Sequence, residues 1–323
     1  MYDLTSIGDI KLDVFIDLGK DAEVMCDINK KDCVMQIKYG EKIPVDSAVA
    51  MMAGSAPNVA IGVRRMGGST TVVSVLGNDN TAILALEVLK SEGISTDYIS
   101  ISKGTKSSFA AVLNFKGEST ILAVHEPHAY TLPENIKTDW TFISELGPKY
   151  KELFEDLALI AKGGAKVGIN PGAIQLEELD DTLFDLIRSC SLLIVNLDEA
   201  RMLCKCPTSD PKILARTLQE LGPKTVIITD GKNGSYGTDD GRVFHAPAFP
   251  DGERVEATGA GDAFSTGVLS ALIANEDLAT AMMWGSVNAS SVIKYVGPQE
   301  GLLTQQQINN LLKARPEYQV TTI

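Results

Sequence analysis

The sequence is poor in histidine and in positive charge. Its 323 residues include three histidines, and 29 lysines and arginines stand against 42 acidic residues, so the formal net charge is −13. Because no basic run exceeds two residues, the chain has no electrostatic footprint for a nucleic-acid backbone or an anionic membrane surface. We therefore expect no nucleic-acid or membrane partner.

Long hydrophobic runs are also lacking. The run at 191–195 has five residues, far fewer than a membrane-spanning helix needs. The first 18 residues carry acids within their apolar stretch and have no cationic region, which is unlike a secretory signal peptide. We expect a soluble, cytoplasmic protein.

Cysteine is present in an odd number and without the spacing of a zinc site. The five are Cys26, Cys33, Cys190, Cys204 and Cys206. The last two form only a C-x-C pair, which is too tight for the usual chelating arrangement. For a cytosolic protein we expect all five to be reduced thiols.

What the sequence does contain is an alternation of strand and helix patterns, with an apolar content of 44% that suffices for a large core. Such alternation is typical of a parallel sheet covered by helices, so we predict a doubly wound α/β fold with a mostly parallel sheet. The expected strands are 70–76, 140–143, 166–169, 192–195 and 225–229, and the expected helices are 57–66, 81–92, 149–162, 175–188, 210–221, 263–273 and 279–294.

Two segments, at about 11–50 and 105–125, interrupt this alternation. They contain alternating apolar stretches without a convincing helix, and the second has strand patterns on both sides of residues 116–118. We expect them to form a small β-sheet lid over the binding edge of the core, with an edge extension of the main sheet as the alternative. No repeat or linker divides the chain, so we expect a single domain, 1–323, with the lid inserted in it.

The most informative stretch is VEATGAGDAFSTG at 255–267. Its small residues permit a tight turn, and the apolar pattern that follows predicts a helix starting there. The N–H groups of Gly259, Ala260 and Gly261 would then form an anion hole at the positive end of the helix. Asp262, kept ionised in the first turn, can accept a proton without help from a histidine. The alternative is a glycine turn that Asp262 simply caps.

This stretch resembles the D-T-x-G-A-G-D signature of the ribokinase-like, or PfkB, sugar kinases. A second block, AGSAPNVA at 53–60 followed by MGG and GND, is similar to the G-G-x-x-x-N-x-A…L-G…G-x-D pattern of the same family. NLDE at 196–199 and TDGKNG at 229–234 also match family motifs in order. Neither a Walker A motif nor a G-x-G-x-x-G is present, which disfavours P-loop kinases and Rossmann dehydrogenases.

The resemblance implies a ribokinase-like fold and an ATP- and Mg²⁺-dependent kinase that phosphorylates a primary hydroxyl of a small sugar. In that family pattern, Asp262 is the general base that takes the proton from the attacking hydroxyl. The amides at 259–261 stabilise the charge of the transferring phosphoryl group.

On the nucleotide side, the resemblance implies that Asn196 and Glu199 orient Mg²⁺ through its waters, Glu199 being the metal-side residue. The alternative is an ordinary capped helix start. Thr229, Gly231 and Gly234 fit the family's nucleotide shelf. Asn288, in the helix expected at 279–294, is expected near adenine, with a plain helix position as the alternative.

On the acceptor side, Asp13 matches the family aspartate that binds sugar hydroxyls, and Gly54 with Asn58 matches the second acceptor contact. The alternative for Asp13 is a solvated strand residue. Lys11 stands where ribokinases proper have asparagine, and Ser55 replaces their lysine, which weakens ribose as the specific acceptor.

Other departures concern charge. NPG at 170–172 occupies the region where several related kinases have N-x-R, so an arginine clamp for a carboxylated or phosphorylated sugar is missing. Glu256 replaces the usual aspartate beside a monovalent cation, and Ser291 lies in the matching downstream stretch, so activation by K⁺ is left open. His125 and His128 lack the zinc-binding H-E-x-x-H spacing; they could touch substrate, with surface histidines as the alternative.

Three further expectations follow. A nucleoside kinase of the same fold is the alternative function, because the same residues serve ribose whether it is free or attached to a base. A catalytically silent binding regulator is disfavoured by intact Asp262, Asn196 and Glu199. The family and the exposed lid edges imply a homodimer formed through the lid.

Overall fold

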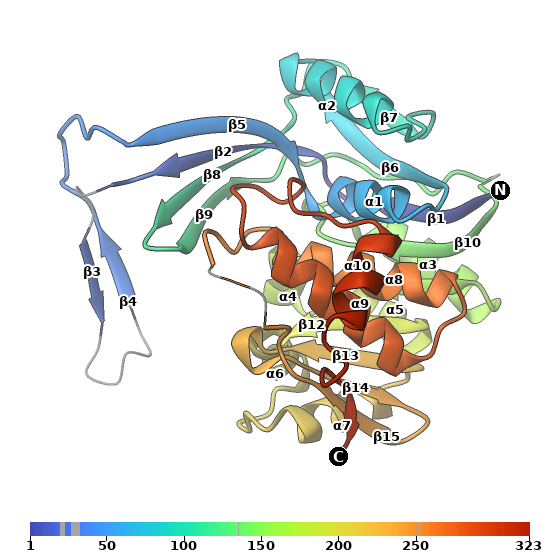
Figure 1. Cartoon of the computed structure of the whole chain (residues 1–323). Helices are drawn as coiled ribbons and strands as arrows, with labels where there is room; N and C mark the ends of the chain where they lie inside the picture. The colour runs from blue at the N-terminus through green and yellow to red at the C-terminus, as the bar shows by residue number, and fades with distance from the viewer. Residues whose placement is uncertain (20–22, 27–32, 135, 251, 253) are drawn as a thin grey trace.

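A ten-stranded sheet forms the centre of the computed structural model, which describes residues 1–19, 23–26, 33–134, 136–250, 252 and 254–323 (Figure 1). Pairing is parallel from β7 to β13 and antiparallel from β13 to β16, which confirms the mostly parallel sheet. The strands, in sheet order, are β16 (Thr321–Thr322), β15 (Arg242–Ala246), β14 (Ser235–Asp239), β13 (Thr225–Thr229), β12 (Leu192–Asn196), β11 (Lys166–Ile169), β10 (Thr138–Ile143), β1 (Tyr2–Ile7), β6 (Thr70–Gly77) and β7 (Ile99–Ser102).

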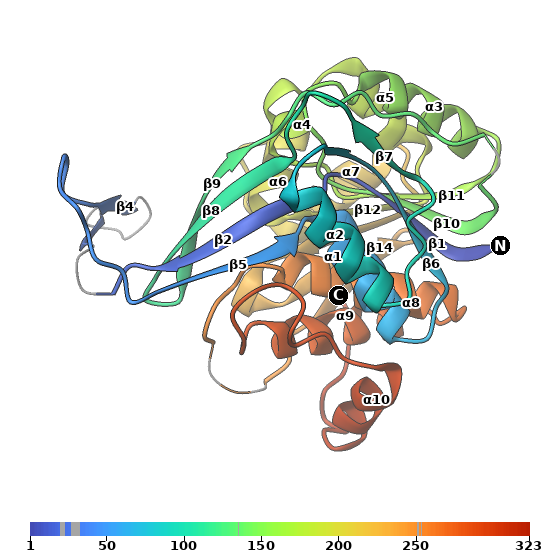
Figure 2. The ribbon, with the colours of Figure 1, turned by 90° about the horizontal axis from the view of Figure 1, so that it is seen from above.

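Helices cover both faces of this sheet, and Figure 2 shows α3 and α5 on one side with α8, α9 and α10 on the other. Each face has its own apolar core, because the strands are buried on both sides and read as nearly continuous β-branched runs. The helices are α1 (Ser55–Arg65), α2 (Asn80–Ser91), α3 (Lys151–Lys162), α4 (Ala173–Glu178), α5 (Asp181–Ser189), α6 (Leu197–Cys204), α7 (Pro211–Glu220), α8 (Ala260–Ile273), α9 (Leu278–Val292) and α10 (Gln305–Lys313). In the part of the chain described, no helix is both long and apolar enough to cross a membrane.

One expected helix, 175–188, is in fact two, α4 and α5. Leu179 ends α4 in the left-handed conformation, with φ of 45°, and the Asp180 carboxylate starts α5 by accepting the N–H of Leu183 at 3.0 Å. The apolar periodicity continues across this break, because both helices pack on the same core, so the pattern alone could not reveal it.

The lid is a separate four-stranded sheet in the order β5-β2-β8-β9, which confirms the lid and rules out an edge extension of the main sheet (Figure 1). Its strands are β5 (Ser47–Ala53), β2 (Lys11–Asp17), β8 (Ser108–Phe115) and β9 (Glu118–Val124). A two-stranded hairpin, β3 (Glu23–Cys26) and β4 (Cys33–Gln36), projects beyond it (Figure 1). Within the expected lid segments, 20–22 and 27–32 lie outside the described residues.

The hairpin corrects the expectation that all five cysteines are reduced, because Cys26 and Cys33 form a disulfide. They are directly opposite each other in the β3–β4 register, which brings their side chains within bonding reach. Among the described residues, Cys190, Cys204 and Cys206 are free thiols, as expected.

Candidate active site

The start of α8 lies at the junction of the lid and the core. Gly259 caps this helix with φ of +81°, and a Cβ there would lie 2.4 Å from the Pro298 side chain, so both conformation and space require glycine. The Ala260 N–H donates to the Ala257 carbonyl at 3.2 Å. Of the three N–H groups expected to form the anion hole, that of Ala260 is therefore already hydrogen-bonded within the turn.

Asp262, in the first turn of α8, faces Asn58 of α1. The Asn58 Nδ2 donates to Asp262 Oδ2 at 2.7 Å. Burial raises the pKa of Asp262, although hydrogen bonds from Asn58 and Ser55 lower it. The sequence argument stressed the helix terminus, which favours the charged form, whereas in the fold loss of water is the larger effect. A carboxylate with a raised pKa is a better proton acceptor.

Asp13, on lid strand β2, also faces this junction. It is only 5% exposed, so it is not a solvated strand residue, and its Oδ1 has no hydrogen-bond partner among the described residues. Burial raises the pKa of Asp13 to about 6, against the lowering effect of Lys11. An unpaired buried carboxylate oxygen is costly unless a ligand supplies a donor, so Asp13 is suited to accept a hydroxyl.

A buried network of charges lies beside Asp13. The Lys11 Nζ is 2.5 Å from Glu145 Oε2, and the two ring nitrogens of His125 are each 3.1 Å from a carboxylate, Nε2 from Glu145 and Nδ1 from Asp9. The Tyr130 hydroxyl donates to the other oxygen of Asp9. Every charged group of this network therefore has an opposite partner.

Contacts within this network determine the protonation states of His125 and Glu145. Hydrogen bonds to Asp9 and Glu145 raise the pKa of His125 to about 9, so it is an imidazolium at neutral pH. Burial alone would raise the pKa of Glu145, but His125 and Lys11 outweigh it and lower that pKa to about 2. The His125 side chain is 10% exposed, so it is not the surface histidine considered above. His128 is likewise buried.

Sequence reasoning did not find Asp9, Glu145 and Tyr130. A usable signal existed for Glu145, which follows β10 at the carboxyl edge of the parallel sheet, where ligands of such folds bind. Gly54 was singled out as an acceptor contact, and the structure adds a steric reason for glycine at this position. Its φ is +118°, and a Cβ would lie 2.2 Å from the Asp9 carbonyl oxygen.

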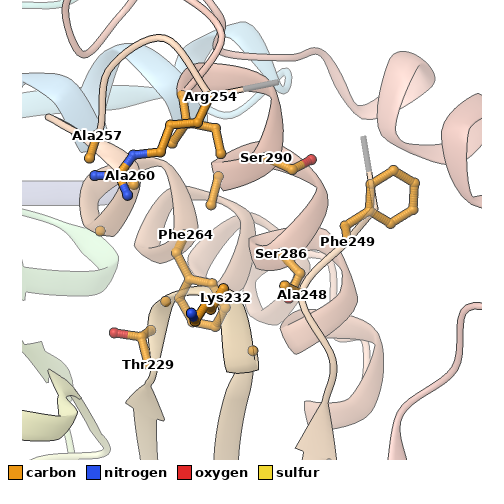
Figure 3. A pocket seen from close by; sticks show the side chains of 15 residues that line it. Thr229, Lys232, Ala248, Phe249, Arg254, Ala257, Ala260, Phe264, Ser286 and Ser290 are labelled. Atoms are coloured by element: carbon orange, nitrogen blue, oxygen red, sulfur yellow. The ribbon is translucent and has the colours of Figure 1, made fainter. Parts of the chain in front are cut away.

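A cavity of about 440 Å³ lies beside the start of α8 (Figure 3). It brings together residues that were expected to contact the nucleotide or the phosphoryl group, namely Thr229, Gly231, Gly234, Ala260 and Gly261. Its size is in the range of small-ligand sites.

Side chains that sequence reasoning missed complete this cavity. Phe249 and Phe264 supply apolar walls, while Figure 3 shows the Arg254 guanidinium reaching toward Ala257 and Ala260. The Arg254 Nη2 also lies 2.8 Å from Glu118 of lid strand β9. The cavity thus has an apolar part and a cationic end next to α8.

Asn288 does not line this cavity and has the plain helix position that was considered as the alternative. It is 0% exposed, its Nδ2 donates to the Ala263 carbonyl at 2.7 Å and its Oδ1 accepts the Leu303 N–H at 3.0 Å. It joins α9 to α8 and to the chain before α10. The neighbouring Ser286 and Ser290, on the same helix, are the ones that reach the cavity.

Asn196 and Glu199 form a reciprocal capping box at the start of α6. Glu199 Oε2 accepts the Asn196 N–H at 2.8 Å, and Asn196 Oδ1 accepts the Glu199 N–H at 2.9 Å. Burial raises the pKa of Glu199, although the Asn196 N–H lowers it. The capped helix start considered above is therefore present, and Glu199 retains a second oxygen that fits a metal-bound water. No cluster of three or more acidic, histidine or cysteine ligands occurs in the described ranges.

The Glu256 carboxylate is surrounded by donors. Oε1 accepts the Thr258 N–H at 2.6 Å and the Ser119 hydroxyl at 2.8 Å, while Oε2 accepts the Gly297 N–H at 3.2 Å. Ser291 is buried on α9. Three donors already point at this carboxylate, and activation by K⁺ stays an untested expectation.

A mostly parallel sheet with helices on both faces, a separate lid and an aspartate at a glycine-capped helix start define the ribokinase-like class of proteins. The chain belongs to the pfkB family of carbohydrate kinases, whose pattern it matches over residues 21–305. Ribokinases and fructokinases of this family are phosphotransferases that act on sugar hydroxyls.

Three known proteins illustrate the similarity. A ribokinase of Bacillus subtilis is 26% identical over 286 residues, covering 85% of this chain and 92% of that protein. The structure of Arabidopsis thaliana ribokinase complexed with ribose and ATP has a TM-score of 0.79 at 20% identity, covering 97% of this chain and 99% of that one. A Methanocaldococcus jannaschii nucleoside kinase has a TM-score of 0.78 at 21% identity, with the same coverage. At these identities the two structures show the fold.

Proposed function

We propose that the protein transfers the γ-phosphate of ATP to a primary hydroxyl of a small sugar, with Asp262 as general base. The observation that carries the proposal is that Asp13 and Asp262 face the same lid junction, where the charge of Asp262 contributes to the raised pKa of the buried Asp13. One can bind a hydroxyl of the acceptor while the other takes the proton from the reacting hydroxyl.

In the proposed step, Asp262 accepts the proton as the acceptor oxygen bonds to the γ-phosphorus and the bond to the bridging oxygen of ATP breaks. The N–H groups at the start of α8 other than that of Ala260, which donates to the Ala257 carbonyl, would stabilise the negative charge of the transferred group. Mg²⁺, when bound, neutralises phosphate charge, and Glu199 would hold one of its waters through the oxygen that the capping box leaves. We do not include K⁺ because Glu256 is already held by three donors.

We propose that the nucleotide binds in the cavity of about 440 Å³ beside the start of α8. Its lining includes residues with small or no side chains, namely Thr229, Gly231 and Gly234, which leave space for a ligand. At Gly261, no atom lies within 4 Å of the position that a Cβ would take. Phe249 and Phe264 offer apolar surface to a base. Because the protein is strongly acidic, Arg254 and the α8 terminus are the features that attract a polyanionic ligand here.

The acceptor is proposed to be uncharged. Lys11 and His125, the two cations near Asp13, are both paired with Glu145, and His125 also with Asp9. A carboxylate or phosphate on the acceptor would have to displace one of these buried partners, which is unfavourable. The network therefore supports a neutral polyol.

We expect phosphorylation of a neutral free sugar such as ribose or fructose in a panel that includes carboxylated sugars and nucleosides, assayed with ATP and Mg²⁺ by ADP release. Turnover of nucleosides alone would support the alternative, consistent with the fold shared with a nucleoside kinase. Turnover of carboxylated sugars alone would contradict the proposed neutrality of the acceptor. Matched reactions without acceptor measure background ATP hydrolysis.

We also propose a homodimer formed through the lid. Its edge strands β5 and β9 carry exposed apolar side chains, among them Val49, Ile121 and Leu122. Sedimentation velocity is expected to show a dimer that Leu122→Glu shifts toward monomer. Ile83→Glu, which introduces the same charge at an equally exposed position on α2, should leave the dimer intact. A monomer at all concentrations for the unaltered protein would contradict this assembly.

A further inference from the structure

We propose that Gln299 is a positioning residue that fixes the amide orientation of Asn58 and thereby orients the base, Asp262. The inference rests on the proposed function only in naming Asp262 as the base. Gln299 lies in the segment between α9 and α10, outside every motif considered above.

The orientation of Gln299 is set by a main-chain carbonyl. Its Nε2 lies 3.0 Å from the carbonyl oxygen of Met52, which can only accept, so the amino end of the Gln299 amide must face it. The same Nε2 has a second proton, and it lies 2.9 Å from Asn58 Oδ1. Gln299 therefore donates both of its side-chain protons, one to lid strand β5 and one to α1.

The orientation of Asn58 follows from that of Gln299. Because its Oδ1 accepts from Gln299, its amino end must face the other way, and there Nδ2 lies 2.7 Å from Asp262 Oδ2. A flipped Asn58 would set its carbonyl oxygen against the Asp262 carboxylate and its amino group against that of Gln299. Only one orientation of the two side-chain amides therefore satisfies all the hydrogen bonds that link Met52 to Asp262, and we call this chain of hydrogen bonds the relay.

The segment that carries Gln299 is itself anchored. The Arg65 Nη1 donates to the Gln299 carbonyl at 2.5 Å, and the same guanidinium makes two contacts with Glu92, at 2.6 and 3.2 Å. Arg65 lies in the last turn of α1, the helix that also bears Asn58. Gln299 is thereby held at both its main chain and its side chain.

The consequence concerns the carboxylate of the base. The Asn58 amide donates to Oδ2 of Asp262, which fixes the orientation of the carboxylate and, together with the hydrogen bond from Ser55, stabilises its ionised form. The other groups acting on this carboxylate are Ser55 from α1, Lys11 and Asp13 from β2, and Glu145 after β10. Among the described residues none of them shares a hydrogen bond with Gln299, so removal of its amide reaches Asp262 through Asn58, while on the other side it also takes the donor from the Met52 carbonyl.

The test uses Gln299→Met, which keeps the length of the side chain and removes both donors. We expect kcat to fall about ten- to hundredfold, as for a small displacement of a catalytic group, with the KM for ATP within about twofold. The acid limb of the pH profile of kcat should move up by about one pH unit, because Asn58 can no longer be held with its donor toward Asp262. Gln306→Met, an exposed change on α10, is the matched control.

A double-variant cycle separates positioning from general damage. If Gln299 acts through Asn58, the loss in kcat from Gln299→Met in an Asn58→Leu background should be less than about twofold. Full multiplication of the two losses, or an unshifted pH profile in Gln299→Met, would overturn the inference. Circular dichroism and the melting temperature check that each variant is folded.

A readout without turnover distinguishes this inference from the proposed function. In ¹⁵N-labelled protein, the side-chain amide signals of Asn58 are expected to follow the ionisation of Asp262, with the midpoint about one pH unit higher in Gln299→Met. An unchanged midpoint would refute the relay. Absence of any phosphotransfer by the unaltered protein would refute the proposed function and leave the midpoint shift to decide the relay.

Discussion

Replacement of Asp262 by asparagine is expected to lower kcat by a factor of about 10² to 10⁴, the range that a positioned general base contributes. The change keeps the shape of the side chain and an oxygen that can accept from Asn58 at the distance of 2.7 Å seen for the aspartate. It removes the ability to take a proton at neutral pH. Affinity for ATP, measured by calorimetry, should be retained, because the nucleotide cavity is formed by other side chains.

The control for this variant is Asp156→Asn, which removes the same charge from an exposed position of α3. Its kcat and its ATP affinity should equal those of the unaltered protein. A kcat within about threefold of the unaltered value for Asp262→Asn would show that another group accepts the proton. Loss of ATP affinity would instead show that Asp262 contributes to the nucleotide side.

Stability should depend on pH through His125, and this is the second large effect. The folded pKa of about 9 lies above the ordinary value of 6.5, so the folded protein holds a proton that the unfolded chain releases first. The stabilisation is fully present below pH 6.5 and is lost as the pH rises through 9. A shift of this size corresponds to about 3 kcal/mol in the free energy of unfolding.

Urea unfolding of the protein between pH 6.5 and 9 measures this effect, and His125→Gln should make the free energy of unfolding nearly constant in that window. Two other shifted carboxylates act outside this window: Glu145, with its pKa lowered to about 2, stabilises above pH 4.5, and Asp13, with its pKa raised to about 6, lowers stability as the pH rises from about 4 to 6. His245→Gln, at the far edge of the main sheet, should keep the unaltered slope. Retention of that slope in His125→Gln would contradict the assignment.

The central fold could be predicted from the sequence because its strands are short apolar runs with clear ends. The bounds of β11 and β13 agree with the expected 166–169 and 225–229. The β3–β4 hairpin was missed because its residues are exposed and show no one-sided burial from which a pairing can be read. The disulfide depended on that register and was missed with it.

In the candidate site too, some residues could be predicted from the sequence and others could not. Residues that lie together in one turn, such as those at 259–262, are placed by local sequence, since a helix start determines its own geometry. Gln299, Glu145 and Asp9 come from separate segments, and their contacts depend on how the lid and core pack. The choice between the two positions considered for Asn288 has the same origin, because a pattern predicts the helix but not which face of it meets the cavity.

The contact between Ser119 of β9 and Glu256 means that the lid is not an exchangeable module. Glu118 and Ser119, neighbours on this strand, hold Arg254 and Glu256 of the loop that leads into α8. A lid taken from a relative would bring a different acceptor surface but would also release that loop. In such chimeras, and over evolutionary change of acceptor, β9 and the 254–258 loop must therefore vary as a pair.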